Sequence, residues 1–170
     1  MGVSANKKND FFKEYAVAID TQYIIRNPKV RYYSYVKRLF DILLSLLALP
    51  IAIPIILIFA IIIKLETPGP AFFLQERVGL HGKYFKVIKL RSMGVDAEKN
   101  GAQWATKNDP RVTKVGAFIR KTRIDELPQL FNVLKGDMSL VGPRPERPMF
   151  TAQFNEEIPG FIDRLQVKPG

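Results

Sequence analysis

The chain has 170 residues, of which 47% are hydrophobic, and its 26 lysines and arginines outnumber 16 acidic residues to give a formal net charge of +10. The absence of cysteine excludes disulfides, cysteine-ligated zinc and thiol nucleophiles, and the single histidine, His81, argues against histidine triads and multi-histidine metal sites. The basic residues are scattered and no nucleic-acid-binding module is recognisable, so we expect phosphates of lipids and of a small substrate as partners, not nucleic acid.

Residues 1–36 are polar and aromatic without firm periodicity. We interpret them as an interfacial segment, because tyrosine is enriched where a chain meets the membrane surface and this segment contains Tyr32, Tyr33 and Tyr35.

Residues 37–65 form the predicted membrane element. Its central stretch from Ile42 to Ile63 carries no charge, and at about 1.5 Å per residue it reaches about 30 Å, enough to enter a bilayer. Pro50 and Pro54 lie inside it and predict a bend, because each removes a backbone donor.

The flanks of this element are basic on both sides, with Lys37 and Arg38 before it and Lys64 and Arg77 after it. A simple span carries its excess of lysine and arginine on one side only. The pattern therefore favours a helix that enters one leaflet, breaks at the prolines and returns. A straight, proline-kinked transmembrane helix is the alternative.

Residues 66–170 predict one small domain of the α+β class. Alternating residues in 71–78 and 83–92, separated by a glycine-containing turn at 79–82, predict a β-hairpin. Apolar residues at helical spacing in 115–119 and 127–134 predict helices, and Gly136 gives the second a stop signal.

Charged residues cluster between Arg120 and Glu126, where the apolar residues at helical spacing are interrupted. Thr122 is the predicted N-cap of a helix whose first turn contains Asp125 and Glu126, and Pro128 suits a start slightly later. Adjacent helical residues diverge by about 100°, so one carboxylate could attack an electrophile while the other holds Mg²⁺. Arg120 and Arg123 could pair with a diphosphate, although acidic residues in a first turn are also routine capping.

Two further signals are weak alone. The prolines in Pro143-Arg144-Pro145 restrict the backbone and present the arginine fork for phosphate or a planar base edge. Lys89 and Arg91 lie at the end of a predicted basic strand, which on its own is more often a solvated face.

In combination these segments resemble the bacterial sugar transferases, the monotopic polyprenyl-phosphate glycosyl-1-phosphate transferases. The resemblance runs from about Lys37 to Gly170 and is carried by Lys-Arg-Leu-Phe-Asp at 37–41, the proline-broken apolar segment, Gln-Glu-Arg-Val-Gly at 75–79, Phe-Lys-Val-Ile-Lys-Leu-Arg-Ser-Met at 85–93 and the block at 123–146.

The resemblance implies a phosphoglycosyl transferase with a two-step reaction. Asp125 would attack the β-phosphate of a UDP-sugar and release UMP, and the phosphosugar would then pass to a polyprenyl phosphate such as undecaprenyl phosphate. Asp125 and Glu126 would hold Mg²⁺. The phosphate and uridine contacts would come from Lys89, Arg91, Arg120, Pro143, Arg144 and Pro145.

The resemblance also implies a place in the cell. We expect a re-entrant membrane helix broken at Pro54, in the bacterial inner (cytoplasmic) membrane, with the catalytic domain facing the cytoplasm and starting exopolysaccharide, O-antigen or glycoprotein glycan assembly. The family usually continues through a Thr-Gly-Trp segment, so we expect a catalytic domain that is incomplete at its C-terminus. The identity of the sugar and the oligomeric state, including a homodimer, stay open.

Two hypotheses from other classes remain. One is a non-catalytic membrane adaptor of the same family, which would release no UMP from any UDP-sugar. The other is a membrane-tethered nucleic-acid binder, which would bind DNA or RNA in a salt-sensitive manner without Asp125 or Glu126.

Overall fold

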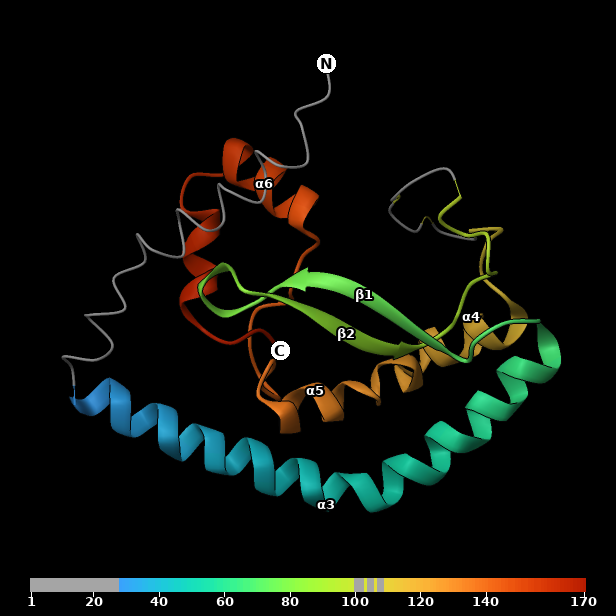
Figure 1. Ribbon diagram of the computed structural model, residues 1–170, viewed down its shortest axis with the longest axis horizontal. Helices are drawn as coiled ribbons and strands as arrows, with labels where there is room; N and C mark the ends of the chain where they lie inside the picture. Colours follow the sequence, from blue (N-terminus) through green and yellow to red (C-terminus); the bar gives the residue numbers. More distant parts are fainter. Residues whose placement is uncertain (1–27, 100–102, 104–105, 107–108) are drawn as a thin grey trace. The chain divides into compact units, whose positions relative to one another are not determined.

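The computed structural model describes residues 28–99, 103, 106 and 109–170, so most of the predicted N-terminal segment lies outside the described residues. Figure 1 shows the mixed α and β content that the sequence predicts. In chain order the elements are helix α3 (Pro28–Glu66), strand β1 (Phe72–Val78), 3-10 helix η1 (Leu80–Gly82), strand β2 (Tyr84–Leu90), helix α4 (Lys114–Lys121), 3-10 helix η2 (Ile124–Glu126), helix α5 (Gln129–Lys135), helix α6 (Pro148–Glu157) and 3-10 helix η3 (Phe161–Gln166).

The chain divides into two compact units. Unit 1 takes in the chain up to Leu46 together with Gln75–Val87 and Asn132–Gly170, and unit 2 takes in Leu47–Leu74 and Ile88–Phe131. Each unit has apolar clusters of its own.

Helix α3 continues without interruption through Pro50 and Pro54. It begins at Pro28, earlier than the predicted membrane element. Proline suits a first helical turn, because its fixed φ is already helical and the missing N–H has no partner to lose there. Within the described residues this is the one helix long and apolar enough to cross a membrane, from Tyr33 to Glu66.

In unit 2, α3 presents a single buried stripe. Ala52, Ile56 and Ile63 pack with Leu90 and Ile119, and Phe59 stacks on Phe118 with ring centroids 5.8 Å apart. The rest of this part of the helix remains apolar and exposed, including Ile51, Leu57, Ile58, Ile61 and Leu65. A helix that is apolar all round but buried along one stripe is suited to lipid on its other faces, which indicates membrane association.

The predicted hairpin is confirmed. Strands β1 and β2 form a two-stranded sheet, drawn in green in Figure 1. Between them the backbone N–H of Gly79 donates to the carbonyl of Lys83 at 2.8 Å. The turn takes His81 and Gly82 through positive φ values of 54° and 73°.

The two helices predicted in 115–134 are confirmed as α4 and α5, but the predicted N-cap is wrong. Thr122 is the C-cap of α4, and its hydroxyl donates to the carbonyl of Phe118 at 2.9 Å. The turn that contains Asp125 and Glu126 has Arg123 at its N-cap, without a side-chain capping bond. The preceding helix α4 is the one with a threonine N-cap, Thr113, whose side chain accepts from the N–H of Gly116. Threonine serves either end, and local sequence does not say whether its hydroxyl points forward or back.

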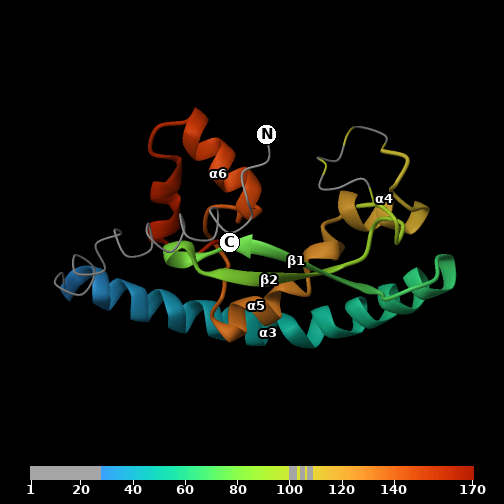
Figure 2. The same ribbon diagram turned by 45° about the horizontal axis from the view of Figure 1, so that its top comes forward.

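In unit 1, α6 and η3 lie side by side, as both Figure 1 and Figure 2 show. Their facing rings include Phe154 and Phe161, with centroids 5.2 Å apart. In the same unit Val78 packs with Ile162 and Leu165. A second apolar cluster consists of Phe85, Val87, Val133 and Met138.

Candidate active site

The Asp125–Glu126 pair lies in unit 2, in η2, a single turn of three residues. Ile124 and Leu127 on either side of the pair pack against the core that contains Leu90 and Ile119. Because its neighbours are held in the core, Asp125 is fixed in place and is only 8% exposed. So short a turn supplies no helix dipole that could attract a phosphate.

Burial has the largest effect on the pKa of Asp125. It raises the pKa of this carboxyl above 3.8, and the adjacent Glu126 raises it further, whereas Lys89, Arg120 and Arg123 act in the opposite direction. Its Oδ1 is buried without a hydrogen-bond partner among the described residues. A buried acceptor with no partner is costly, and such groups concentrate at sites where a ligand or ion completes the bonding.

Basic side chains from different segments of the chain lie close to Glu126. The Nζ of Lys89, in β2, lies 2.9 Å from Oε1 of Glu126, and both side chains are mostly buried. Nη1 of Arg123 lies 3.7 Å from the same Oε1, and the side chain of Arg123 is 71% exposed. Arg120, in the last turn of α4, acts on Asp125 through its charge.

Arg91 has a visible structural role. Its guanidinium donates to the carbonyls of Thr67 and Pro68, just after α3 ends, and to the hydroxyl of Thr67. Arg91 is 6% exposed. The prediction that it also contacts phosphate stays a prediction.

Glu66 carries a role that sequence analysis missed. Its Oε1 accepts from the N–H of Lys114 at 2.8 Å and from the N–H of Val115 at 3.2 Å, so the end of α3 caps the start of α4. Glu66 and Lys114 are 48 positions apart in the sequence, so no local signal could indicate this contact.

Asp125 and Glu126 fit a magnesium ion only in combination with a substrate. Among the described residues no group of three or more histidine, cysteine or acidic side chains could enclose a metal. Mg²⁺, however, is commonly held by one or two carboxylates together with substrate phosphates and water. The orphaned Oδ1 of Asp125 supplies one such oxygen.

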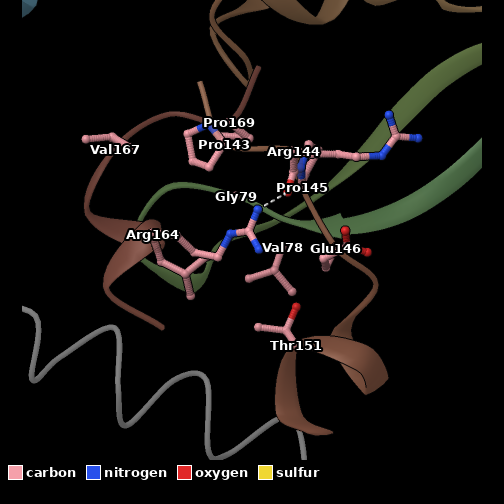
Figure 3. A pocket seen from close by; sticks show the side chains of 11 residues that line it. Val78, Gly79, Pro143, Arg144, Pro145, Glu146, Thr151, Arg164, Val167 and Pro169 are labelled. Carbon is pink, nitrogen blue, oxygen red and sulfur yellow. Dashed lines mark hydrogen bonds between the residues drawn. The ribbon is translucent and has the colours of Figure 1, made fainter. Parts of the chain in front are cut away.

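The Pro143-Arg144-Pro145 segment lies in unit 1, where it lines a small pocket with Val78, Glu146 and Arg164 (Figure 3). An Nη of Arg164 donates to the carbonyl of Arg144 at 2.6 Å, and this guanidinium lies 4.6 Å from the ring centroid of Phe161. Arg164 thus holds the backbone of the loop. No motif in the sequence indicates this role for Arg164.

The exposed side chain of Arg144 extends away from the other labelled side chains in Figure 3. Arg77, in β1, donates to the carbonyl of Pro145 at 3.0 Å. The loop is therefore held through its backbone, which leaves the Arg144 fork directed outward.

Unit 1 also fixes the start of the apolar stretch. Asp41, which is 3% exposed, accepts from Nζ of Lys37 at 2.6 Å and from the N–H of Leu140 at 3.2 Å. The guanidinium of Arg38 donates to the carbonyls of Val133 and Leu134 at the end of α5.

The exposed apolar helix indicates membrane association, and the buried carboxyl of Asp125 lies within range of the positive charges of Lys89, Arg120 and Arg123. Residues 32–170 match the family described as bacterial sugar transferase. The match covers most of the chain, and the protein belongs to this family of transferase enzymes.

Three relatives show how similar the chain is to known members. It is 58% identical over 163 residues to a Bacillus subtilis (strain 168) protein provisionally named undecaprenyl-phosphate N-acetylgalactosaminyl 1-phosphate transferase, with 96% of this chain and 90% of the relative covered. It is 54% identical over 138 residues to the UDP-N-acetylgalactosamine-undecaprenyl-phosphate N-acetylgalactosaminephosphotransferase of Aeromonas hydrophila, covering 81% of this chain and 33% of the relative.

The third relative is the UDP-glucose:undecaprenyl-phosphate glucose-1-phosphate transferase of Escherichia coli (strain K12), 48% identical over 134 residues. That alignment covers 79% of this chain and 29% of the relative. The chain therefore spans most of the Bacillus protein and about a third of the other two.

Proposed function

We propose that this protein transfers a sugar-1-phosphate from a UDP-sugar to a polyprenyl phosphate such as undecaprenyl phosphate, as the names of its relatives state for those proteins. The observation that carries the proposal is Asp125, a buried carboxylate with an unpartnered oxygen, next to Glu126, whose carboxylate pairs with Lys89 and Arg123. Phosphoryl transfer needs this combination of a fixed nucleophile and positioned positive charge.

In the first step, an oxygen of Asp125 attacks the β-phosphorus of the donor. The bond from that phosphorus to the bridging oxygen breaks, and UMP leaves with the electron pair. The sugar phosphate is then joined to Asp125 as an acyl phosphate.

In the second step, a phosphate oxygen of the polyprenyl phosphate attacks the same phosphorus. The bond to Asp125 breaks, which restores the carboxylate and releases the lipid-linked diphosphate sugar. Each step is an in-line displacement at one phosphorus, so a single fixed carboxylate serves both.

The surrounding residues hold and neutralise the substrate. Lys89 and Arg120 balance the diphosphate charge, and Glu126 with Asp125 would hold Mg²⁺, which neutralises phosphate oxygens when it is bound. The outward fork of Arg144, between Pro143 and Pro145, would contact the uridine end of the donor. We further propose a re-entrant α3 in the bacterial inner membrane, with this chemistry on the cytoplasmic side.

The test is a donor screen in the presence of Mg²⁺ and undecaprenyl phosphate. UDP-N-acetylgalactosamine and UDP-glucose are tried first, because they correspond to the sugars in the relatives' names. UMP release is expected with at least one donor. Without acceptor lipid, labelled sugar phosphate should remain on the protein, and mass spectrometry should place it on Asp125.

The variant Asp125→Asn should stay folded and membrane-bound and release no UMP, because an amide cannot form the acyl phosphate. Full UMP release by this variant, or label on another residue, would refute the assignment. Failure of every donor, with the protein intact, would instead support the non-catalytic adaptor.

A further inference from the structure

Arg123 has a backbone conformation that its residue type disfavours. Its φ of 61° and ψ of 14° place it in the left-handed region, between the C-cap Thr122 of α4 and the first residue of η2. For a residue with a Cβ this conformation is disfavoured sterically, and the position just after a helix is usually glycine or asparagine. The other non-glycine residue with positive φ in the described part of the chain is His81.

Packing does not explain an arginine at this position. The side chain is 71% exposed, so it fills no core, and the turn itself is held by backbone bonds: the N–H of Glu126 donates to the carbonyl of Arg123 at 3.1 Å. Glycine would satisfy the same turn with less strain.

The charge of Arg123, in contrast, has a definite location. Its guanidinium lies 3.7 Å from the Glu126 carboxylate, next to Asp125 in the chain. An exposed ion pair at this distance stabilises a fold by little, so the pair alone does not compensate for the strain. A planar, exposed guanidinium this close to Glu126 is, however, well suited to binding a diphosphate by two parallel hydrogen bonds.

We infer that Arg123 is a binding residue for the diphosphate of the donor, and that its side chain, not its backbone, accounts for an arginine in this turn. The inference rests on the proposed function, and the strained turn now gives a structural reason for the pairing of Arg123 with a diphosphate that the sequence only suggested. In the free protein the guanidinium lies against Glu126. When a diphosphate binds it pairs with phosphate, and Glu126 keeps its partner Lys89.

The experiment exploits the strain. Full-length protein in detergent or lipid nanodiscs is compared as wild type, Arg123→Gly, Arg123→Asn, Arg123→Lys and, as a control for charge alone, Lys121→Gln, which changes an exposed cation in the last turn of α4. For each, the melting temperature and the dissociation constant for UDP with Mg²⁺ are measured at low and high salt.

We expect Arg123→Gly and Arg123→Asn to melt at a temperature no lower than that of wild type. Both variants should nevertheless bind UDP about tenfold more weakly at low salt, and their UDP affinity should depend less on salt. Arg123→Lys should fall between these variants and wild type, because it keeps the charge and loses the planar fork. Lys121→Gln should bind as wild type does.

Unchanged UDP affinity in Arg123→Gly, while wild type binds UDP and releases UMP from a donor, would overturn this inference and leave the proposed function standing. A lowered melting temperature in Arg123→Gly would also overturn it, since the arginine would then serve the fold. Absence of UDP binding by wild type would overturn both.

Discussion

Lys89 and Glu126, 37 residues apart in the sequence, are joined by an ion pair of 2.9 Å beside the buried Asp125. The two charges act on the pKa of Asp125 in opposite directions: Lys89 lowers it and Glu126 raises it, against the larger effect of burial, which raises it. A change in either partner should therefore move the ionisation of Asp125 in a predictable direction.

Lys89→Met should raise the pKa of Asp125 further, because it removes a cation that favours the carboxylate, and Glu126→Gln should lower it. If ionised Asp125 is the nucleophile, the acid limb of the pH profile for UMP release should move to higher pH in the first variant and to lower pH in the second. A higher KM in Lys89→Met with an unmoved acid limb would show that Lys89 acts on the substrate alone.

Asp125→Asn should not destabilise the protein at neutral pH. Burial holds the folded-state pKa of Asp125 above its usual 3.8, so the stability due to this group is present at low pH and is lost as pH rises through the folded-state value. The Asp125→Asn variant has no such pH-dependent loss of stability, because an asparagine amide does not ionise. The melting temperature of the variant relative to that of wild type should therefore increase as the pH rises from below 3.8 through the folded-state pKa of Asp125, as followed by thermal denaturation. If the melting temperature of the variant instead falls relative to that of wild type as the pH rises, the ionised Asp125 carboxylate does not destabilise the fold.

Gly116→Ala should be strongly destabilising even though alanine is the better helix former. A Cβ at Gly116 would lie 2.0 Å from the backbone carbonyl oxygen of Ser92, which cannot move without displacing the chain around it. We expect a loss of at least about 2 kcal/mol, which outweighs the gain of about 1 kcal/mol in helix propensity. Gly94→Ala is the matched control, because nothing lies within 4 Å of its added Cβ. Urea denaturation of the two variants measures the difference.

Asp41→Ala should cost about 3 kcal/mol of unfolding free energy, because it leaves Lys37 and the N–H of Leu140 without their shared acceptor in a buried setting. Lys135→Gln removes an ion pair with Asp137 whose lysine is 72% exposed, and it should cost less than about 1 kcal/mol. Equal losses in the two variants would show that the Asp41 contacts are not a buried network.

The proposed re-entrant helix predicts that both ends of its apolar part face the cytoplasm. Cysteines placed by Ser34→Cys and Thr67→Cys in this cysteine-free chain should both resist a membrane-impermeant thiol reagent in intact cells and react after permeabilisation. Labelling of only one of them in intact cells would establish a straight span.

Some of the site could be predicted because its signals are local. The hairpin follows from alternation along two short segments, α5 ends where Gly136 permits a φ of 98°, and Asp125 and Glu126 are adjacent in the sequence. The error at Thr122 has the same origin. Its hydroxyl can bond forward or backward, and in the folded chain it bonds backward, to the carbonyl of Phe118 at the end of α4.

The sequence by itself determined that this chain carries a long apolar helix, a hairpin and a carboxylate pair among cations, since composition, periodicity and adjacency are properties of the chain. The tertiary structure alone decided that Glu66 caps α4, that Lys89 pairs with Glu126, and that Asp125 is buried with an unpartnered oxygen. These contacts join segments tens of residues apart, and a buried carboxyl acquires its altered pKa only when folding removes water and brings the other charges within range.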